Sequence, residues 1–148
     1  MYRKYALITG FSVGVGLGGT ALADDVADAV NSIPGAIEDV RISGSWENDD
    51  KSGAYRIVVA RTGLEPVTAR LFIQWLAYEV DGAAVVEKSV EIKELGELGL
   101  DVVDYMTESD VDGLSIFIET INPADGYDET YELHLFSPTE YIFGPATN

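Results

Sequence analysis

Residues 69–95, ARLFIQWLAYEVDGAAVVEKSVEIKEL, decide the fold class. Residues 69–80 are apolar at nearly every position, which is typical of a central strand that is covered on both faces. Residues 84–95 alternate between apolar and polar side chains, which predicts a strand with one solvated face. Between the two runs, Asp81 and Gly82 are residue types that tolerate the positive φ of a tight hairpin turn. The stretch therefore predicts two neighbouring antiparallel strands.

Period-two alternation recurs in five further runs that are bounded by Gly, Asp, Asn and Pro. They are residues 40–46, 54–62, 101–108, 113–121 and 130–136. The run 101–108 also fits a short helix, although we favour a strand, and residues 94–101 are expected to form a loop. The tail after residue 136 leaves room for a short edge strand. About seven strands predict an all-β, antiparallel β-sandwich of immunoglobulin-like or jelly-roll type, with a small β-barrel as the alternative.

The first 23 residues have the pattern of a secretory signal peptide. Arg3 and Lys4 form a basic start, residues 5–19 are almost wholly apolar or glycine, and residues 21–23 fit an A-x-A cleavage site. Asp24 would then begin the mature protein. This pattern predicts a periplasmic or secreted protein with no membrane span after cleavage.

The same stretch carries a glycine pattern. Residues 4–16, KYALITGFSVGVG, resemble the first strand and nucleotide-binding turn of the short-chain dehydrogenase/reductase family, which implies a dinucleotide enzyme. The similarity ends at residue 16, and none of the eight tyrosines begins the family's Tyr-x-x-x-Lys motif. We therefore interpret residues 1–23 as a signal peptide, residues 24–36 as a short N-terminal segment and residues 37–148 as a single β-sandwich domain.

The charge is strongly acidic and unevenly distributed. The formal net charge is −17, and residues 94–148 contain no lysine or arginine. Such a field repels nucleic acid and anionic lipids, and it favours cations and basic proteins as partners. An acidic surface also keeps a protein soluble in a salty environment. The absence of cysteine excludes disulfides, thiol catalysis and a lipoprotein anchor.

One acidic stretch suggests a metal site. Glu108, Asp110, Asp112 and Glu119 fall at positions 1, 3, 5 and 12 of an EF-hand-like loop, and Gly113 falls at position 6. Alternate carboxylates in such a loop converge on a hard cation, so Ca²⁺ is the cofactor that the sequence suggests. The stretch runs into a predicted strand where an EF-hand has a helix, so an acidic β-turn is the alternative interpretation.

Other groups that could carry chemistry are sparse. His134 is the single histidine, it lies beside Glu132, and no G-x-S-x-G motif accompanies it. Zinc binding by histidine and cysteine lacks ligands. Five aromatic residues suit either the core or a sugar-stacking platform, namely Trp46, Tyr55, Trp75, Tyr78 and Tyr105.

Two functional hypotheses follow. The first is an exported, non-catalytic β-sandwich, a binding or structural module with an acidic surface that binds a protein or surface partner, with calcium stiffening its acidic loops. The second is a small exported hydrolase that uses carboxylates and acts on carbohydrate. The oligomeric state is open in both.

Overall fold

The computed structural model describes residues 21–147 as two units, and the boundary between them in the sequence falls between Ile33 and Pro34. The first unit contains helix α1, Ala21–Asn31, on which Val26 and Val30 are exposed. The predicted signal peptide lies outside the described residues, apart from residues 21–23. Within the described part of the chain, neither helix combines the length and apolar character that crossing a membrane requires.

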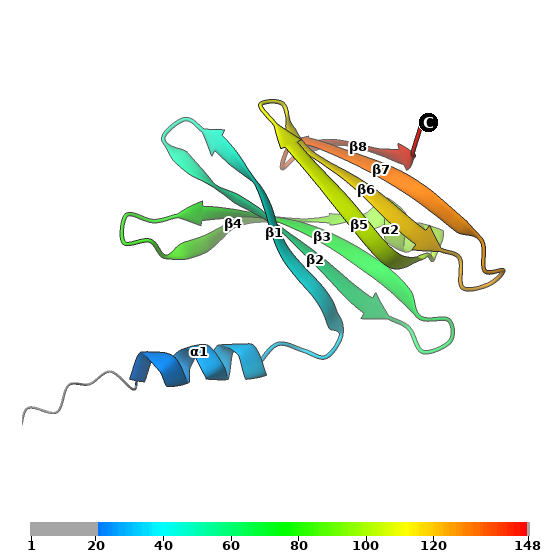
Figure 1. The fold of residues 1–148 in the computed structure, drawn as a ribbon, viewed down its shortest axis with the longest axis horizontal. Coiled ribbons are helices and arrows are strands. Elements are labelled where there is room, and N and C mark those ends of the chain that lie inside the picture. Colours follow the sequence, from blue (N-terminus) through cyan, green and yellow to red (C-terminus); the bar gives the residue numbers. More distant parts are fainter. Residues whose placement is uncertain (1–20, 148) are drawn as a thin grey trace, which may run out of the picture. The chain divides into compact units, whose positions relative to one another are not determined.

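The second unit confirms the expected all-β architecture with two antiparallel sheets (Figure 1). Its elements are β1 Ile37–Asn48, β2 Lys51–Thr62, β3 Thr68–Tyr78, β4 Ala84–Ile92, α2 Lys93–Leu98, β5 Asp101–Asp110, β6 Gly113–Ile121, β7 Asp128–Ser137 and β8 Glu140–Pro145. The hairpin expected at Asp81-Gly82 joins β3 to β4, and the tail adds β8 at the edge of the second sheet.

Each sheet is built from consecutive strands. The first sheet has the order β1-β2-β3-β4 and the second has the order β5-β6-β7-β8 (Figure 1). The chain therefore passes from one sheet to the other once, through α2. The immunoglobulin-like or jelly-roll type is not confirmed, because those sandwiches exchange strands between their sheets through Greek-key connections.

The core lies between the two sheets. Alternate side chains of β2 and β3 meet alternate side chains of β6 and β7, as period-two strands with one buried face require. The fully buried aliphatic members from these four strands are Ile57, Leu71, Ile73, Leu114, Ile116, Ile118, Leu133 and Leu135. Central strand β3 is apolar on both faces in the sequence, but on its outward face Phe72 is only half-buried.

Strand β1 turns its polar side chains inward. Arg41 and Ser43 point toward β5, whereas Val40 and Ile42 are exposed on the outer face of the sheet. The register then shifts by one residue between Ser43 and Trp46. Such a β-bulge reverses the alternation and re-aims the following side chain. It places Trp46 on the inward face, where it packs against the core.

The connection between the sheets differs from the expected one. The run 84–95 was expected to stay extended to Leu95, with a loop over 94–101, but β4 ends at Ile92 and α2 occupies Lys93–Leu98. Leu95 is fully buried in the core. One helical turn lets Leu95 reach the core while the chain changes direction, and a continued strand would carry it past the sheet.

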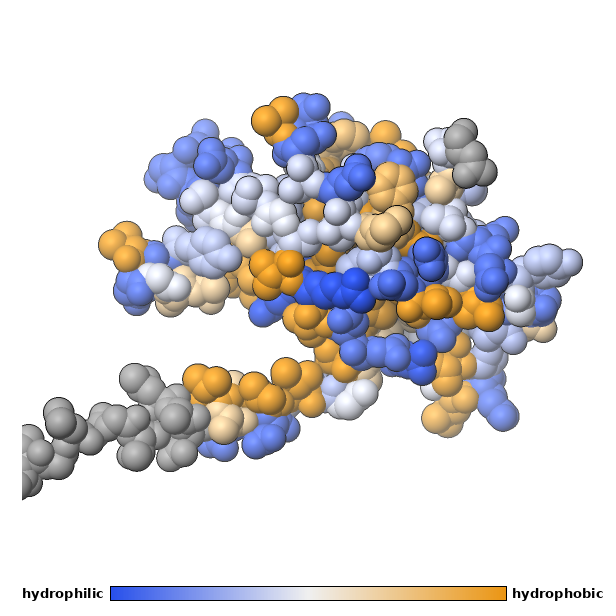
Figure 2. Space-filling view, in the orientation of Figure 1, coloured by the Kyte–Doolittle hydropathy of each residue, from blue (hydrophilic) through white to orange (hydrophobic). Residues whose placement is uncertain are grey.

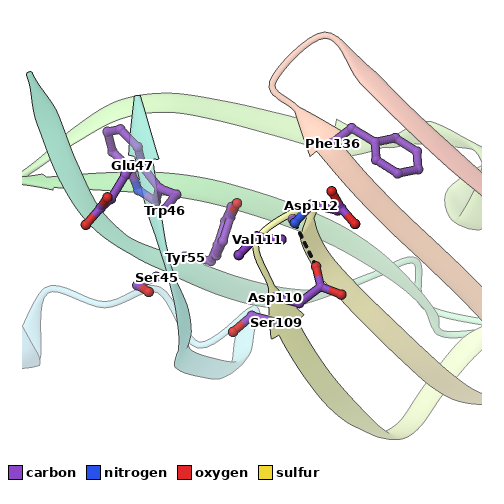
Figure 3. Close-up of a pocket in the computed structure, with 10 residues that line it drawn as sticks. Ser45, Trp46, Glu47, Tyr55, Ser109, Asp110, Val111, Asp112 and Phe136 are labelled. Atoms are coloured by element: carbon purple, nitrogen blue, oxygen red, sulfur yellow. Dashed lines mark hydrogen bonds between the residues drawn. The ribbon is translucent and has the colours of Figure 1, made fainter. Parts of the chain in front are cut away.

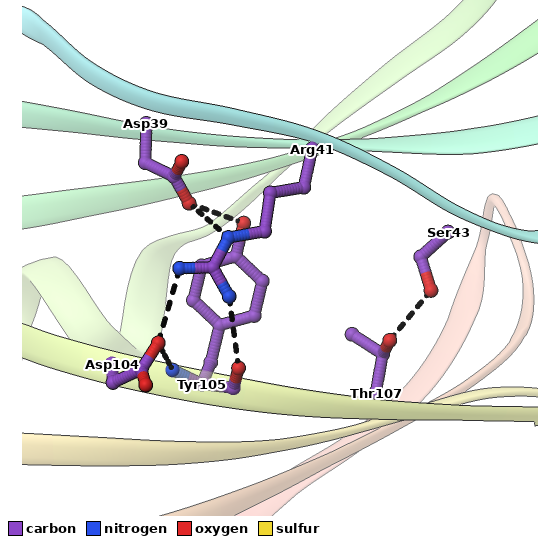
Figure 4. Close-up of polar contacts among 6 residues, drawn as sticks. All are labelled: Asp39, Arg41, Ser43, Asp104, Tyr105 and Thr107. Carbon is purple, nitrogen blue, oxygen red and sulfur yellow. Dashed lines mark hydrogen bonds and ion pairs between the residues drawn. The ribbon is translucent and has the colours of Figure 1, made fainter.

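A polar seam joins β1 to β5 at one side of the sandwich (Figure 4). Arg41 Nη2 lies 3.0 Å from Asp104 Oδ1, and its guanidinium carbon lies 4.2 Å from the centre of the Tyr105 ring. The Tyr105 hydroxyl donates to Asp39 Oδ2 at 2.6 Å. Burial, together with the hydrogen bond to Asp39, raises the pKa of Tyr105. The seam therefore fixes one sheet on the other through directional contacts.

We expect Tyr105→Phe to lower the free energy of unfolding by about 1–2 kcal/mol at pH 7, because the hydroxyl donates to a carboxylate. The pKa of Tyr105 is raised in the folded state above its ordinary value of 10.0. The unfolded state therefore releases its phenol proton first as pH rises. The contribution of Tyr105 to the free energy of unfolding is fully present below pH 10 and is lost as the pH rises above it.

Urea unfolding from pH 7 to pH 11 measures this effect. The stability of the parent protein should fall above pH 10, and that of Tyr105→Phe should fall less. Identical pH dependence in the two proteins would show that Tyr105 makes no such contribution.

Candidate functional site

A cleft opens at the end of the sandwich that carries the β1–β2 hairpin and the β5–β6 turn (Figure 3). Its volume is about 480 Å³, and it adjoins a second cleft of about 650 Å³ along the β1–β2 hairpin. The first cleft is lined by Ser45, Trp46, Glu47, Tyr55, Ser109, Asp110, Val111, Asp112, Gly113 and Phe136. Figure 2 shows hydrophilic side chains over the tip of the β1–β2 hairpin, which lines the second cleft, while Ser45, Trp46 and Glu47 of β1 form one wall of the first.

Trp46 forms the aromatic part of that wall, and it is held firmly. Its indole N–H donates to the backbone oxygens of Ala54 and Leu76, at 3.2 and 3.1 Å. Trp46 is paired across the strands with Gly53. A Cβ on Gly53 would lie 1.6 Å from the oxygen of Leu76. The ring orientation is therefore set by the backbone of β2 and β3.

Tyr55 lies at the floor of the cleft. Its residue is only 4% exposed, and its ring meets Trp75 edge-on with the ring centres 5.6 Å apart. In Figure 3 its hydroxyl points into the space between β1 and the β5–β6 turn. None of the side-chain hydrogen bonds among residues 21–147 uses this hydroxyl, and burial is the cause that raises the pKa of Tyr55. The cleft therefore contains a hydroxyl that is open to water and has no partner among the described residues, on a ring that is otherwise buried.

The β5–β6 turn forms the opposite wall, and it is acidic. Asp110 Oδ1 accepts a hydrogen bond from the backbone N–H of Asp112 at 2.9 Å, which fixes the turn. Asp110, Asp112 and Glu47 are all exposed to solvent. The ten residues that line this cleft include three carboxylates and no lysine, arginine or histidine.

The four candidate calcium ligands do not converge on one point. Asp110 and Asp112 lie at the turn and line the cleft. Glu108 is paired across the strands with Ser115, and Glu119 lies four residues further along β6, opposite Asp104. Four residues of strand span about 13 Å. Among residues 21–147, no three His, Asp or Glu side chains are grouped closely enough to hold a metal ion.

The aromatic candidates separate into two groups. Trp46, Tyr55 and Trp75 lie together at the two adjoining clefts. Tyr78 is exposed at the end of β3, and Tyr105 belongs to the polar seam.

Half of the lining residues were not predicted from the sequence, and they are Ser45, Glu47, Ser109, Val111 and Phe136. The alternation of 130–136 marks Phe136 as an outward-facing aromatic, which is the one sequence signal that pointed to it.

The single histidine takes part in a hydrogen-bonded chain elsewhere. Ser115 Oγ lies 2.8 Å from His134 Nδ1, and His134 Nε2 lies 2.7 Å from Glu132 Oε1. Ser115 and His134 are directly paired between β6 and β7, on the outward face of the second sheet. These three residues line neither of the two clefts described above.

No protein-family model matches the chain, and no curated protein or solved structure is significantly similar to it.

We expect Tyr55→Phe to change the free energy of unfolding by less than about 0.5 kcal/mol, because its hydroxyl makes no hydrogen bond within the protein. Tyr105→Phe is the matched comparison, since the residue is equally buried and its hydroxyl is bonded to Asp39. Urea unfolding of both variants at pH 7 makes the measurement. A loss above 1 kcal/mol in Tyr55→Phe would mean that its hydroxyl has a structural role.

Proposed function

We propose that this chain is an exported, non-catalytic binding module that holds a protein or surface partner in the cleft between the β1–β2 hairpin and the β5–β6 turn. The observation that carries the proposal is the Tyr55 hydroxyl, which opens into the floor of the cleft without a protein partner on a ring that is otherwise buried. Because packing already holds the ring in place, a ligand that displaces water from this hydroxyl meets a hydrogen-bonding group that needs no further ordering.

The walls of the cleft support the same proposal. Two backbone carbonyls hold the Trp46 indole, and a side-chain hydrogen bond fixes the turn at Asp110. Groups that are already held in place lose little conformational entropy when a ligand arrives. An aromatic surface beside a few placed polar groups is the usual composition of a binding site. The candidate calcium ligands lie apart, so metal forms no part of this proposal.

An NMR titration of ¹⁵N-labelled protein tests the proposal without assuming the charge of the ligand. The probes are blocked Gly-Arg-Gly, blocked Gly-Glu-Gly and maltotriose, and the readout is the Trp46 indole signal with the amides of 109–113. We expect at least one probe to shift these signals, and Tyr55→Phe to weaken that probe. Tyr127→Phe is the control, because Tyr127 is exposed at a distant turn. The proposal fails if no probe shifts them, or if Tyr55→Phe has no effect.

A hydrolase that acts on carbohydrate is the second candidate. It is favoured by the presence of Asp110, Asp112 and Glu47 beside Trp46 in one cleft, since carboxylates and aromatic rings also serve glycoside hydrolysis. The assay is the release of reducing ends from oligosaccharides. The binding module should release none. Activity that disappears in both Asp110→Asn and Asp112→Asn would establish the hydrolase instead, and activity that disappears in His134→Ala would also contradict a non-catalytic module.

The proposal of export rests on the sequence of residues 1–23. Mass spectrometry of the protein recovered outside the cytoplasm of a bacterial expression host tests it. We expect a mature chain that begins at Asp24. A protein that stays in the cytoplasm and keeps Met1 would contradict both export and cleavage.

A further inference from the structure

We infer that the cleft recognises an arginine side chain presented by a protein partner. This inference rests on the proposed function and adds the chemistry of the ligand. It is carried by two independent features, the acidic lining of the cleft and the hydroxyl of the otherwise buried Tyr55, which opens into the cleft without a partner among the described residues.

The charge of the cleft selects a cation. Glu47, Asp110 and Asp112 line it without a neighbouring base among the ten lining residues. The second sheet, which supplies the β5–β6 turn, contains no lysine or arginine, and the formal net charge of the chain is −17. The adjoining cleft is lined by two lysines, Lys88 and Lys51, and Lys51 is paired with Glu87. The three carboxylates are exposed at the cleft, and their like charges give it a negative potential that attracts a cation.

The aromatic ring and the acceptors that line the cleft favour a guanidinium over other cations. A guanidinium is planar, stacks on aromatic faces and donates in several directions at once. The Trp46 indole provides the aromatic face, and Tyr55 provides a neutral oxygen at the floor that can accept an N–H. The free oxygen of Asp110 and the carboxylates of Asp112 and Glu47 provide further acceptors at the rim. A compact ammonium can satisfy fewer of these groups at one time.

The test compares arginine with its neutral isostere. The probes are blocked Gly-Arg-Gly, the same peptide with citrulline in place of arginine, and the same peptide with lysine. Affinity is measured on the purified chain from the Trp46 indole shift, at 0.05 and 0.15 M salt. We expect the arginine peptide to bind at least about tenfold more tightly than the citrulline peptide, more tightly than the lysine peptide, and more weakly at the higher salt.

Two variants assign this binding to the cleft. Tyr55→Phe should weaken the arginine peptide about fivefold, since it removes one hydrogen bond. Asp110→Asn should weaken it about threefold, because the amide keeps the acceptor for the Asp112 N–H and loses only the charge. Asp125→Asn is the matched control, because Asp125 accepts the N–H of Tyr127 in an equivalent turn outside the cleft. It should leave the affinity unchanged.

The outcomes separate the inference from the proposed function. Equal binding of the arginine and citrulline peptides, with both weakened by Tyr55→Phe, would overturn the inference and keep the cleft as a binding site. Binding of maltotriose alone at the same residues would also overturn the inference and keep the cleft as a binding site. Arginine binding that is lost equally in Asp125→Asn and Asp110→Asn would show attraction by general charge, and it would overturn the inference. A cleft that responds to no probe would overturn both.

Discussion

Gly53→Ala is expected to lower the free energy of unfolding by more than about 3 kcal/mol. A Cβ at this position would lie 1.6 Å from the oxygen and 2.7 Å from the carbon of the Leu76 carbonyl. Both atoms belong to the backbone of neighbouring strand β3, so no side-chain rotation relieves the clash. Strands β2 and β3 would have to separate at this point.

The same substitution reaches the candidate site. The Trp46 indole donates to Leu76 O and lies opposite Gly53, so displacement of that carbonyl releases the ring. We therefore expect the Trp46 indole signal of Gly53→Ala to move or broaden under conditions where the variant stays folded.

Gly144→Ala is the matched control for Gly53→Ala. It lies in strand β8 with no atom within 4 Å of the added Cβ. Its effect should stay within about 0.5 kcal/mol. Thermal and urea unfolding of both variants make the comparison. Equal stability of the two would mean that β2 and β3 do not approach each other as closely as the structure shows.

Ile57→Ala is expected to cost about 3 kcal/mol, whereas Ile42→Ala should cost less than about 1 kcal/mol. The two isoleucines lie on neighbouring strands of one sheet. Ile57 is fully buried between the sheets, and Ile42 is 56% exposed on the outer face. Truncation of Ile57 leaves a cavity in the core, whereas truncation of Ile42 removes apolar surface that is already exposed to solvent.

Urea unfolding of the two alanine variants measures the difference directly. It tests the orientation of β1, in which the polar side chains face the second sheet. If Ile42→Ala costs as much as Ile57→Ala, the apolar face of β1 is covered, and the polar seam at Arg41 and Tyr105 is not the inner contact.

The strands were predictable because most of them keep a strict period of two. The hairpin at Asp81-Gly82 and the clean alternation of β6 need only local information, since one face of each strand is buried. The orientation of β1 did not follow in the same way. A single-residue bulge between Ser43 and Trp46 breaks the period, and its position depends on contacts that are remote in sequence. At that bulge, Gly44 has a φ of +59° and a Cβ there would lie 2.6 Å from Ser109.

The candidate site was predictable only in its parts. Asp110 and Asp112 stand out in the sequence because they alternate beside a glycine. That spacing, however, suggested a calcium-binding loop and not the wall of a cleft. Their neighbours in space, Glu47 and Tyr55, come from strands of the other sheet. The unpartnered hydroxyl of Tyr55 has no sequence signal at all, because the lack of a partner is a property of the packed state. Local pattern thus locates the turn, and only tertiary structure joins it to an aromatic wall.

The most direct test of the central claim, that the cleft at Tyr55 is a binding site for an arginine side chain, is an isotope-filtered NOE spectrum of the ¹⁵N,¹³C-labelled protein with unlabelled, blocked Gly-Arg-Gly. We expect NOEs from the arginine δ-methylene protons to ring protons of both Trp46 and Tyr55. NOEs confined to residues outside the cleft, such as the exposed ring of Tyr127, would contradict the account.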